Sequence, residues 1–317
     1  MRAIPVFFAI DSNVVMQCGV TITSLLMNAR PETFYEVFIL CNQSQLSETS
    51  RMTLLSAFEG FKNVSISFKD VGESFKDTPL RTNGHITLAT YYRLLIPVLF
   101  PQFDKVIYAD IDMIFQRDLS DLYETACSKN ELVAAALDLS IDGKYYFKSE
   151  LPYRIGKSEK DYFNAGFLVM NLSQMRKENT VEEFLRQTEN SHAENDQDVL
   201  NIVCKGRTQW LDNSYNFQTN HFSNYMWKEQ TRSLSFYGLF SVATLHYTGP
   251  YKPWNSTECV AFDTWWHYYK QSPFYNDNVY FRRQQEQIEI SRNDYKKKSN
   301  KQLIMRVLVN IKHRIFG

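Results

Sequence analysis

The sequence predicts an α/β fold built on a mostly parallel sheet, from two observations. Short apolar runs rich in β-branched and aromatic residues recur along the chain, as is typical of buried strands. Segments of helical length, such as residues 16–30 and 43–59, separate the early runs, and this alternation is typical of a parallel sheet covered by helices. The expected strands are residues 6–10, 36–40, 64–68, 105–110 and 132–138, and the runs 165–172 and 242–247 complete or flank the sheet.

The composition is that of a globular protein with a large core. The 317-residue chain is 44% hydrophobic and 22% charged, which excludes a disordered chain. Its five cysteines are widely spaced and form no CxxC pair, so we expect free thiols rather than a zinc site or a disulfide framework. No run approaches the roughly 20 apolar residues of a membrane span, and the first run is too short for a signal peptide. We therefore expect a cytoplasmic protein.

Charge is unevenly distributed, although the net charge is zero. Residues 291–317 carry eight basic side chains and one acidic side chain, a net charge of +7 that leaves −7 on residues 1–290. A basic amphipathic helix is typical of binding to an anionic membrane surface, although a solvated helix or one packed on its own domain has the same pattern. No nucleic-acid partner is expected, because the body is acidic and lacks a basic stripe. The aliphatic face of the predicted helix consists of Ile304, Val307, Leu308, Ile311 and Ile315.

Two aspartates interrupt the apolar run at residues 107–115, "IYADIDMIF". In an extended chain, Asp110 and Asp112 would point to the same side. Two neighbouring anions raise each other's pKa unless a cation lies between them. A divalent metal would supply that cation, because Mg²⁺ and Mn²⁺ prefer hard oxygen ligands. For this motif alone, a pair of capping or turn aspartates is the alternative interpretation.

Further candidate residues lie at predicted strand ends. Asp11, Asp110 and Asp138 each follow an apolar run, and ligands of open α/β sheets bind at the carboxyl ends of the strands. We therefore expect these three acids on one rim of the sheet, although acids at strand ends are common without a function.

The stretch "LHYTGPYKPW" at 245–254 offers groups suited to a metal-bound diphosphate. His246 could complete a metal site and would favour Mn²⁺ over Mg²⁺. Gly249 lets the backbone approach a ligand closely, and Lys252 offers a charge for phosphate. A structural histidine followed by a turn explains the same residues without a ligand.

The stretch "NDQDVLN" at 195–201 places Asp196, Gln197 and Asp198 before an apolar helical start. Acids in the first turn of a helix are stabilised by its dipole, so capping is one interpretation. The other is a carboxylate and an amide presented to a pocket.

Six motifs, taken in order, resemble the retaining glycosyltransferases of family 8, nucleotide-sugar enzymes with a GT-A fold. The similarity spans residues 4–270 and is strongest to bacterial UDP-galactose-dependent galactosyltransferases that build surface oligosaccharides. Residues 194 and 195 depart from those enzymes and leave the acceptor open. The motifs are "FFAIDSN" (7–13), "HITLATYYRLLIP" (85–97), "DKVIYADIDMIFQRDL" (104–119), "YFNAGFLVMNL" (162–172), "NDQDVLN" (195–201) and "HYTGPYKPW" (246–254).

The resemblance implies a role for each matching residue. It implies a metal site of Asp110, Asp112 and His246, binding Mn²⁺ or, as the alternative, Mg²⁺. It implies UDP contacts from Ala9, Asp11, Asn13, Gly249 and Lys252. It implies donor-sugar contacts from His85, Arg93, Asp110, Asn164, Asp196 and Gln197. Gln197, Asp138 and Asp196 are expected at the reacting centre, with Gln197 beside the anomeric carbon.

The function implied is a retaining, metal-dependent hexosyltransferase with a GT-A catalytic domain over residues 1–270 and a helical, membrane-associating segment over 271–317. We expect transfer of a hexose, galactose favoured, from a UDP-sugar to a hydroxyl of a lipid-linked or protein-linked glycan at the inner face of the cell membrane. The alternatives are a UDP-glucose-dependent glucosyltransferase, and a self-glucosylating or nucleotide-sugar-binding protein serving an assembly partner. The aromatic stretch 262–275 could line an acceptor groove, although core packing is the commoner use.

Overall fold

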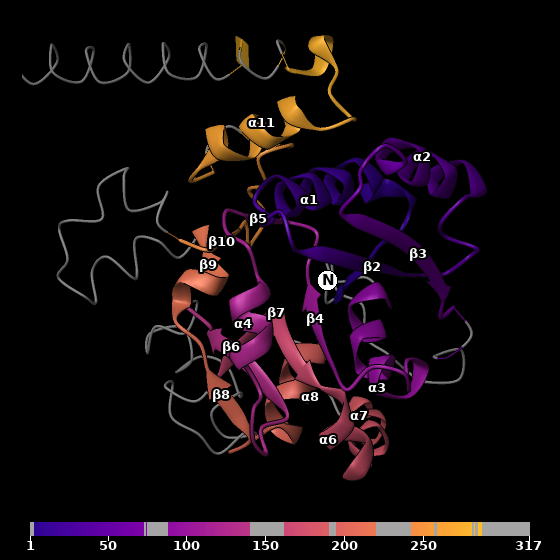
Figure 1. The fold of residues 1–317 in the computed structure, drawn as a ribbon, viewed down its shortest axis with the longest axis vertical. Helices are drawn as coiled ribbons and strands as arrows, with labels where there is room; N and C mark the ends of the chain where they lie inside the picture. The colour runs from indigo at the N-terminus through magenta and orange to yellow at the C-terminus, as the bar shows by residue number, and fades with distance from the viewer. Residues whose placement is uncertain are drawn as a thin grey trace, which may run out of the picture.

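The structure is a computed structural model that describes residues 3–72, 74, 88–139, 162–189, 195–219, 242–256, 259–280, 282 and 285–286. Its centre is a seven-stranded sheet in the order β3-β2-β1-β4-β7-β6-β8 (Figure 1). All pairings are parallel except the two made by β7, so the predicted α/β fold with a mostly parallel sheet is confirmed. The strands are β1 Ala3–Ala9, β2 Phe34–Cys41, β3 Val64–Asp70, β4 Lys105–Ala109, β6 Val133–Leu137, β7 Phe163–Asn171 and β8 Thr208–Trp210.

Helices cover both faces of this sheet, which is why its strands read as continuous apolar runs. Alternate residues of β1 point to opposite faces: Val6 and Phe8 pack with α1 and α2, while Phe7 packs in the core of the other face. The first face carries α1 Val15–Met27, α2 Glu48–Phe58 and α4 Ser120–Thr125. The second carries the 3-10 helix Leu88–Leu95, α3 Ile96–Leu99, α6 Leu172–Lys177, α7 Thr180–Thr188 and α8 Asn195–Val203.

A second, three-stranded sheet lies beside the first, in the order β5-β10-β9. It consists of β5 Met113–Phe115, β9 Phe217–Gln218 and β10 Thr244–His246, and α11 Phe262–Gln271 packs against α1 beside it (Figure 1). The run 242–247 was expected either to complete or to flank the main sheet, and the structure shows that it flanks it. The aromatic side chains of α11 are buried, so core packing is their observed use.

One expectation about the aspartate motif is wrong in its geometry. Residues 107–115 do not form one strand, because β4 ends at Ala109 and β5 begins at Met113 in the other sheet. Asp110, Ile111 and Asp112 form the turn between the two sheets. Alternation along an extended strand is therefore not what directs the two carboxylates.

The expected rim of acids is present. Strands β1, β4 and β6 run in the same direction, so Asp11, Asp110 and Asp138 follow their carboxyl ends at one edge of the sheet. Because β7 runs the opposite way, its first residues, including Asn164, lie at that same edge.

All five cysteines are free and buried, as predicted. Phe274 packs beyond the end of α11, where a Cβ on Gly19 would lie 2.1 Å from its ring. No described helix is both long enough and apolar enough to span a bilayer. His85 and the basic segment 291–317 lie outside the described residues.

Candidate active site

The turn between β4 and β5 is held from both sides by backbone hydrogen bonds. The Asp110 N–H donates to the Gly166 carbonyl of β7 over 2.8 Å, and the Tyr247 N–H donates to the Asp112 carbonyl over 2.9 Å. The turn thus joins the main sheet to the end of β10, which carries His246. This connection brings residues 110, 112 and 246 together although 134 positions separate the last two.

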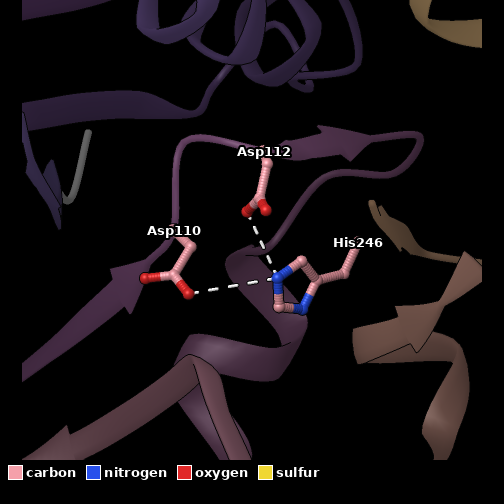
Figure 2. Close-up of side chains that lie close together, drawn as sticks. All are labelled: Asp110, Asp112 and His246. Atoms are coloured by element: carbon pink, nitrogen blue, oxygen red, sulfur yellow. Dashed lines mark ion pairs between the residues drawn. The ribbon is translucent and has the colours of Figure 1, made fainter. Parts of the chain in front are cut away.

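The side chains of Asp110, Asp112 and His246 converge on one point (Figure 2). The imidazole Nε2 of His246 lies 3.2 Å from Asp112 Oδ1 and 3.9 Å from Asp110 Oδ2. One ligand atom from each residue lies within 4.8 Å of the other two. Two carboxylate oxygens and an imidazole nitrogen at this spacing form a donor set that suits a divalent metal.

Each carboxylate also has a cation of its own, on the oxygen turned away from His246. Arg93 Nη2 donates to Asp110 Oδ1 over 3.0 Å, and the Lys252 ammonium pairs with Asp112 Oδ2. The other Asp112 oxygen, Oδ1, is buried and accepts no hydrogen bond. A buried acceptor without a donor is costly unless a cation satisfies it. The site therefore fits a metal ion bound between the three side chains.

Charge neighbours keep Asp112 ionised. Burial raises the pKa of its carboxyl, but the charge of the Lys252 ammonium and its hydrogen bond to Oδ2 act in the opposite direction, and the lowering prevails. The pKa of Asp112 consequently lies well below its usual range. A metal ligand must be deprotonated, so this environment keeps Asp112 ready to bind a cation.

Gly166 leaves the space that His246 occupies. A Cβ at this position would lie 2.2 Å from His246 Cε1 and 2.9 Å from Asp110 Oδ2. Such contacts are far inside van der Waals distance, so any larger residue would displace the imidazole or the carboxylate.

Gly166→Ala is therefore expected to weaken metal binding by at least about 10-fold and to cost roughly 1–3 kcal/mol of unfolding free energy from overpacking. Calorimetric titration with Mn²⁺ and urea unfolding would measure the two effects. Gly60→Ala is the matched control, because a Cβ there meets no atom within 4 Å. Equal Mn²⁺ affinity in the two variants would show that Gly166 does not shape the site.

Arg93 lies beneath the metal donors. Only 3% of its side chain is exposed, and its guanidinium lies 4.2 Å from the centre of the Tyr108 ring. Besides Asp110, it contacts Asp196, with Nε 3.1 Å from Asp196 Oδ2. Burial raises the pKa of Asp196 to about 6, with Arg93 lowering it and Asp110 raising it further. Arg93 thus links the metal donors to the first turn of α8.

A cavity of about 320 Å³ opens beside the donors. Gly249 lines this cavity and has a φ of 74°, a left-handed conformation that favours glycine. Asn13 does not line this cavity: its side chain is exposed, and its N–H donates to Asp11 Oδ1 over 2.8 Å. The expected ligand-contacting residues that do line it are Ala9, Asp11, Asp110, Asp112, Gly249 and Lys252.

A second group of predicted residues forms a buried hydrogen-bonded network. Gln197 Nε2 donates to Asp138 Oδ2 over 2.8 Å, and Gln197 Oε1 accepts the Ala165 N–H over 2.9 Å. Asn164 Nδ2 donates to the same Asp138 oxygen over 3.2 Å. The Tyr162 hydroxyl lies 3.3 Å from Gln197 Nε2 and donates to Asp198 over 2.7 Å. Asp138, Asn164 and Gln197 thus act as one polar unit at the sheet edge.

A family model, glycosyl transferase family 8, matches residues 5–258. The chain belongs to this family. Two lipopolysaccharide glycosyltransferases are among the proteins similar to this chain. The lipopolysaccharide 1,3-galactosyltransferase of Salmonella typhimurium is 26% identical over 257 residues, which cover 78% of this chain and 72% of that protein. The lipopolysaccharide 1,2-glucosyltransferase of Escherichia coli is 26% identical over 260 residues, which cover 79% of this chain and 72% of that protein.

The fold is also that of a solved glycosyltransferase. The crystal structure of the galactosyltransferase LgtC in complex with donor and acceptor sugar analogs superposes with a TM-score of 0.70 at 25% identity. The match covers 87% of this chain and 98% of that one. The GT-A fold expected from the sequence motifs is therefore confirmed, and this family 8 glycosyltransferase carries an Asp-Asp-His cluster fitted to a divalent metal.

The structure adds residues to the family 8 site that the motifs did not single out. Tyr162 and Gly166 lie within a quoted motif, but nothing in its spacing marks them as contacts of Gln197 and His246. Asn216, within "NSYNFQ", lies outside every motif and contacts His246 directly. A lone asparagine in a polar loop carries no signal that sequence reasoning could have used.

Proposed function

We propose that this family 8 glycosyltransferase transfers a hexose, galactose favoured, from a UDP-sugar to a hydroxyl of a glycan acceptor, with retention of configuration and with Mn²⁺ as cofactor. One observation carries the proposal: the two aspartates of the Asp-Asp-His cluster line the same cavity as Ala9, Asp11 and Gly249. A metal at that position would face a diphosphate, and the hydrogen-bonded network of Gln197 lies on the other side of Asp110 along the rim.

The donor would be held by the residues that line the cavity. Asp11 accepts hydrogen bonds from a ribose, and the exposed backbone at Gly249 approaches the phosphates closely. Lys252 places an ammonium beside them, held by Asp112 and by the Tyr247 carbonyl over 2.5 Å. When bound to Asp110, Asp112 and His246, Mn²⁺ would supply Lewis-acid neutralisation of the charge that develops on the departing UDP.

Retention requires either a covalent intermediate or attack on the face from which UDP leaves. An amide is a poor nucleophile, so Gln197 favours the second route. In that route the bond from the anomeric carbon to UDP breaks, and its electron pair leaves with the phosphate oxygen. The acceptor oxygen bonds to the same face and gives its proton to a phosphate oxygen of the donor.

Gln197 would stabilise the positive charge that develops on the sugar. Two neighbours set the orientation of its amide group. The Asp138 carboxylate accepts from the amide nitrogen, and the Ala165 N–H donates to the amide oxygen. The amide is therefore held with its carbonyl oxygen toward β7, and that oxygen keeps a second lone pair. Asp138 and Asp196 would hold hydroxyls of the sugar.

The donor sugar is the part of the proposal with two candidates. Similarity to the galactosyltransferase of Salmonella and to LgtC supports galactose, and similarity to the E. coli glucosyltransferase supports glucose. The alternative function is a self-glucosylating or nucleotide-sugar-binding protein that serves an assembly partner. A self-glucosylating protein would gain hexose mass on incubation with UDP-sugar and Mn²⁺ alone.

The decisive experiment is a screen of UDP-sugars for slow hydrolysis in the presence of Mn²⁺, which needs no acceptor. We expect UDP release from UDP-galactose above that from UDP-glucose, and loss of release with a chelator. Faster UDP release from UDP-glucose would contradict galactose as the donor sugar. UDP release that a chelator does not reduce would contradict the proposed metal dependence.

We also propose that the catalytic domain comprises residues 1–270 and that residues 271–317 bind the inner, anionic surface of the cell membrane, where a lipid-linked acceptor would lie. The net charge of +7 on residues 291–317 supports this proposal. Deletion of 291–317 is expected to release the protein from vesicles containing anionic lipid and to preserve transfer to a soluble acceptor. Equal vesicle sedimentation of the full-length and truncated proteins would contradict it.

A further inference from the structure

Asn216 is fully buried behind the metal donors and lines no part of the cavity. It ends the 3-10 helix Asn213–Asn216, immediately before β9, which pairs with β10. Its side-chain Oδ1 lies 2.8 Å from His246 Nδ1, the ring nitrogen turned away from the two aspartates. Its Nδ2 lies 2.9 Å from Asn164 Oδ1.

The direction of each hydrogen bond in this chain is determined by groups whose chemistry allows one role. The Gly166 N–H can only donate, and it lies 3.0 Å from the Asn164 side chain, so that atom is the carbonyl oxygen. The Asn164 amide nitrogen then faces the Asp138 carboxylate, which is an acceptor when ionised. Asn216 must present its NH₂ to the Asn164 oxygen, and its own oxygen therefore faces His246.

We infer that Asn216 is a positioning residue that holds His246 as the Nδ1–H tautomer, with the lone pair of Nε2 directed at the metal position, an inference that rests on the metal-dependent function proposed above. The Asn216 oxygen can only accept, so Nδ1 carries the proton in neutral imidazole. Metal-binding histidines generally donate their second ring N–H in this way, and the partner fixes ring orientation and tautomer.

The same segment also positions the sugar side of the rim. Gln218, two residues on and likewise fully buried, donates from Nε2 to the Leu137 carbonyl over 2.9 Å. Its Oε1 accepts the Leu139 N–H over 2.9 Å. These two bonds hold the backbone on both sides of Asp138. Residues 216–218 thus set the distance between His246 and Asp138.

The tautomer can be measured directly in the full-length protein without added metal. Two-bond ¹⁵N–¹H spectra of the imidazoles distinguish Nδ1–H from Nε2–H, and the signals of His246 are assigned by their loss in His246→Gln. The chain has six histidines, so the spectrum is simple. We expect the Nδ1–H form for His246 in wild type. The Nε2–H form would overturn the inference, whatever the protein's activity.

Metal affinity tests the positioning role with matched variants, by calorimetric titration with Mn²⁺. Asn216→Ala is expected to weaken binding about 10- to 100-fold, the usual effect of losing a partner of a metal-binding histidine. Asn216→Asp is expected to recover most of the affinity, because a buried carboxyl can accept from His246 and, when protonated, donate to Asn164. Thr244→Val is the control: Thr244 is equally buried on β10, and its hydroxyl donates to the Tyr215 carbonyl rather than to His246 or Asn164.

Wild-type affinity in Asn216→Ala, or equal weakening in Asn216→Ala and Thr244→Val, would overturn the role. If Asn216→Ala does not fold, the tautomer measured in wild type decides the question. Wild-type protein that binds no Mn²⁺ would end the metal proposal, while the tautomer would still report on Asn216. The two failures are therefore distinguishable.

Discussion

Asp110→Asn is expected to lower kcat for hexosyl transfer by about 1000-fold or more, because it removes one anionic metal ligand and the charge stabilisation that depends on it. The fold is expected to survive. An asparagine oxygen can still accept from Arg93 and from the Tyr108 hydroxyl, both 3.0 Å from Asp110 Oδ1. Transfer from the UDP-sugar selected in the donor screen measures the effect, together with Mn²⁺ titration.

The control for Asp110→Asn is Asp104→Asn, which makes the same change just before the same strand. The Asp104 side chain is 91% exposed and lies 3.6 Å from Arg176. This control should retain both turnover and Mn²⁺ affinity. Unchanged turnover in Asp110→Asn would show that the residue does not bind a catalytic metal.

Gln197→Ala is expected to lower kcat on the order of 100-fold, similar to the loss of one preorganised electrostatic group, with the KM for the donor within about threefold of wild type. The Gln197 side chain holds Asp138 and the Ala165 N–H but does not line the cavity assigned to UDP. Its loss should therefore weaken stabilisation of the sugar in the transition state more than binding of the nucleotide.

Steady-state kinetics at saturating acceptor separate the two effects. Gln174→Ala, on the partly exposed side of α6, removes the same amide away from the site and should leave both constants unchanged. A variant of Gln197 with a raised KM and wild-type kcat would assign this residue to donor binding alone.

The Asp-Asp-His cluster shows where the prediction from the sequence was correct and where its physical argument was incomplete. The three donors were predicted correctly as neighbours, but the reason offered for the two aspartates, alternation along one strand, was wrong. The chain leaves the main sheet at Asp110 and enters the second sheet at Met113. The carboxylates meet because a turn, pinned by Gly166 and Tyr247, carries them to the end of β10.

The charges of the two neighbouring aspartates are compensated by side chains of the protein as well as by the proposed metal. Arg93 neutralises Asp110 and Lys252 neutralises Asp112, each through one oxygen, while the second oxygen faces His246. These cations lie 17 and 140 residues from their partners. A sequence pattern indicates residue types and strand ends. It does not indicate which side chains from distant segments come into contact in the folded protein.

The sequence by itself determined six of the seven strands of the main sheet, all but β8, together with the cover of helices on that sheet and the chemical groups available at its carboxyl edge. These features depend on local periodicity and on where apolar runs stop, and both can be read along the chain. Only the tertiary structure decided which oxygen faces which nitrogen, and which tautomer His246 adopts. Those properties arise from Asn216, Gly166 and Arg93, whose effects depend on packing across separate elements and on the requirement that every buried polar group find a partner.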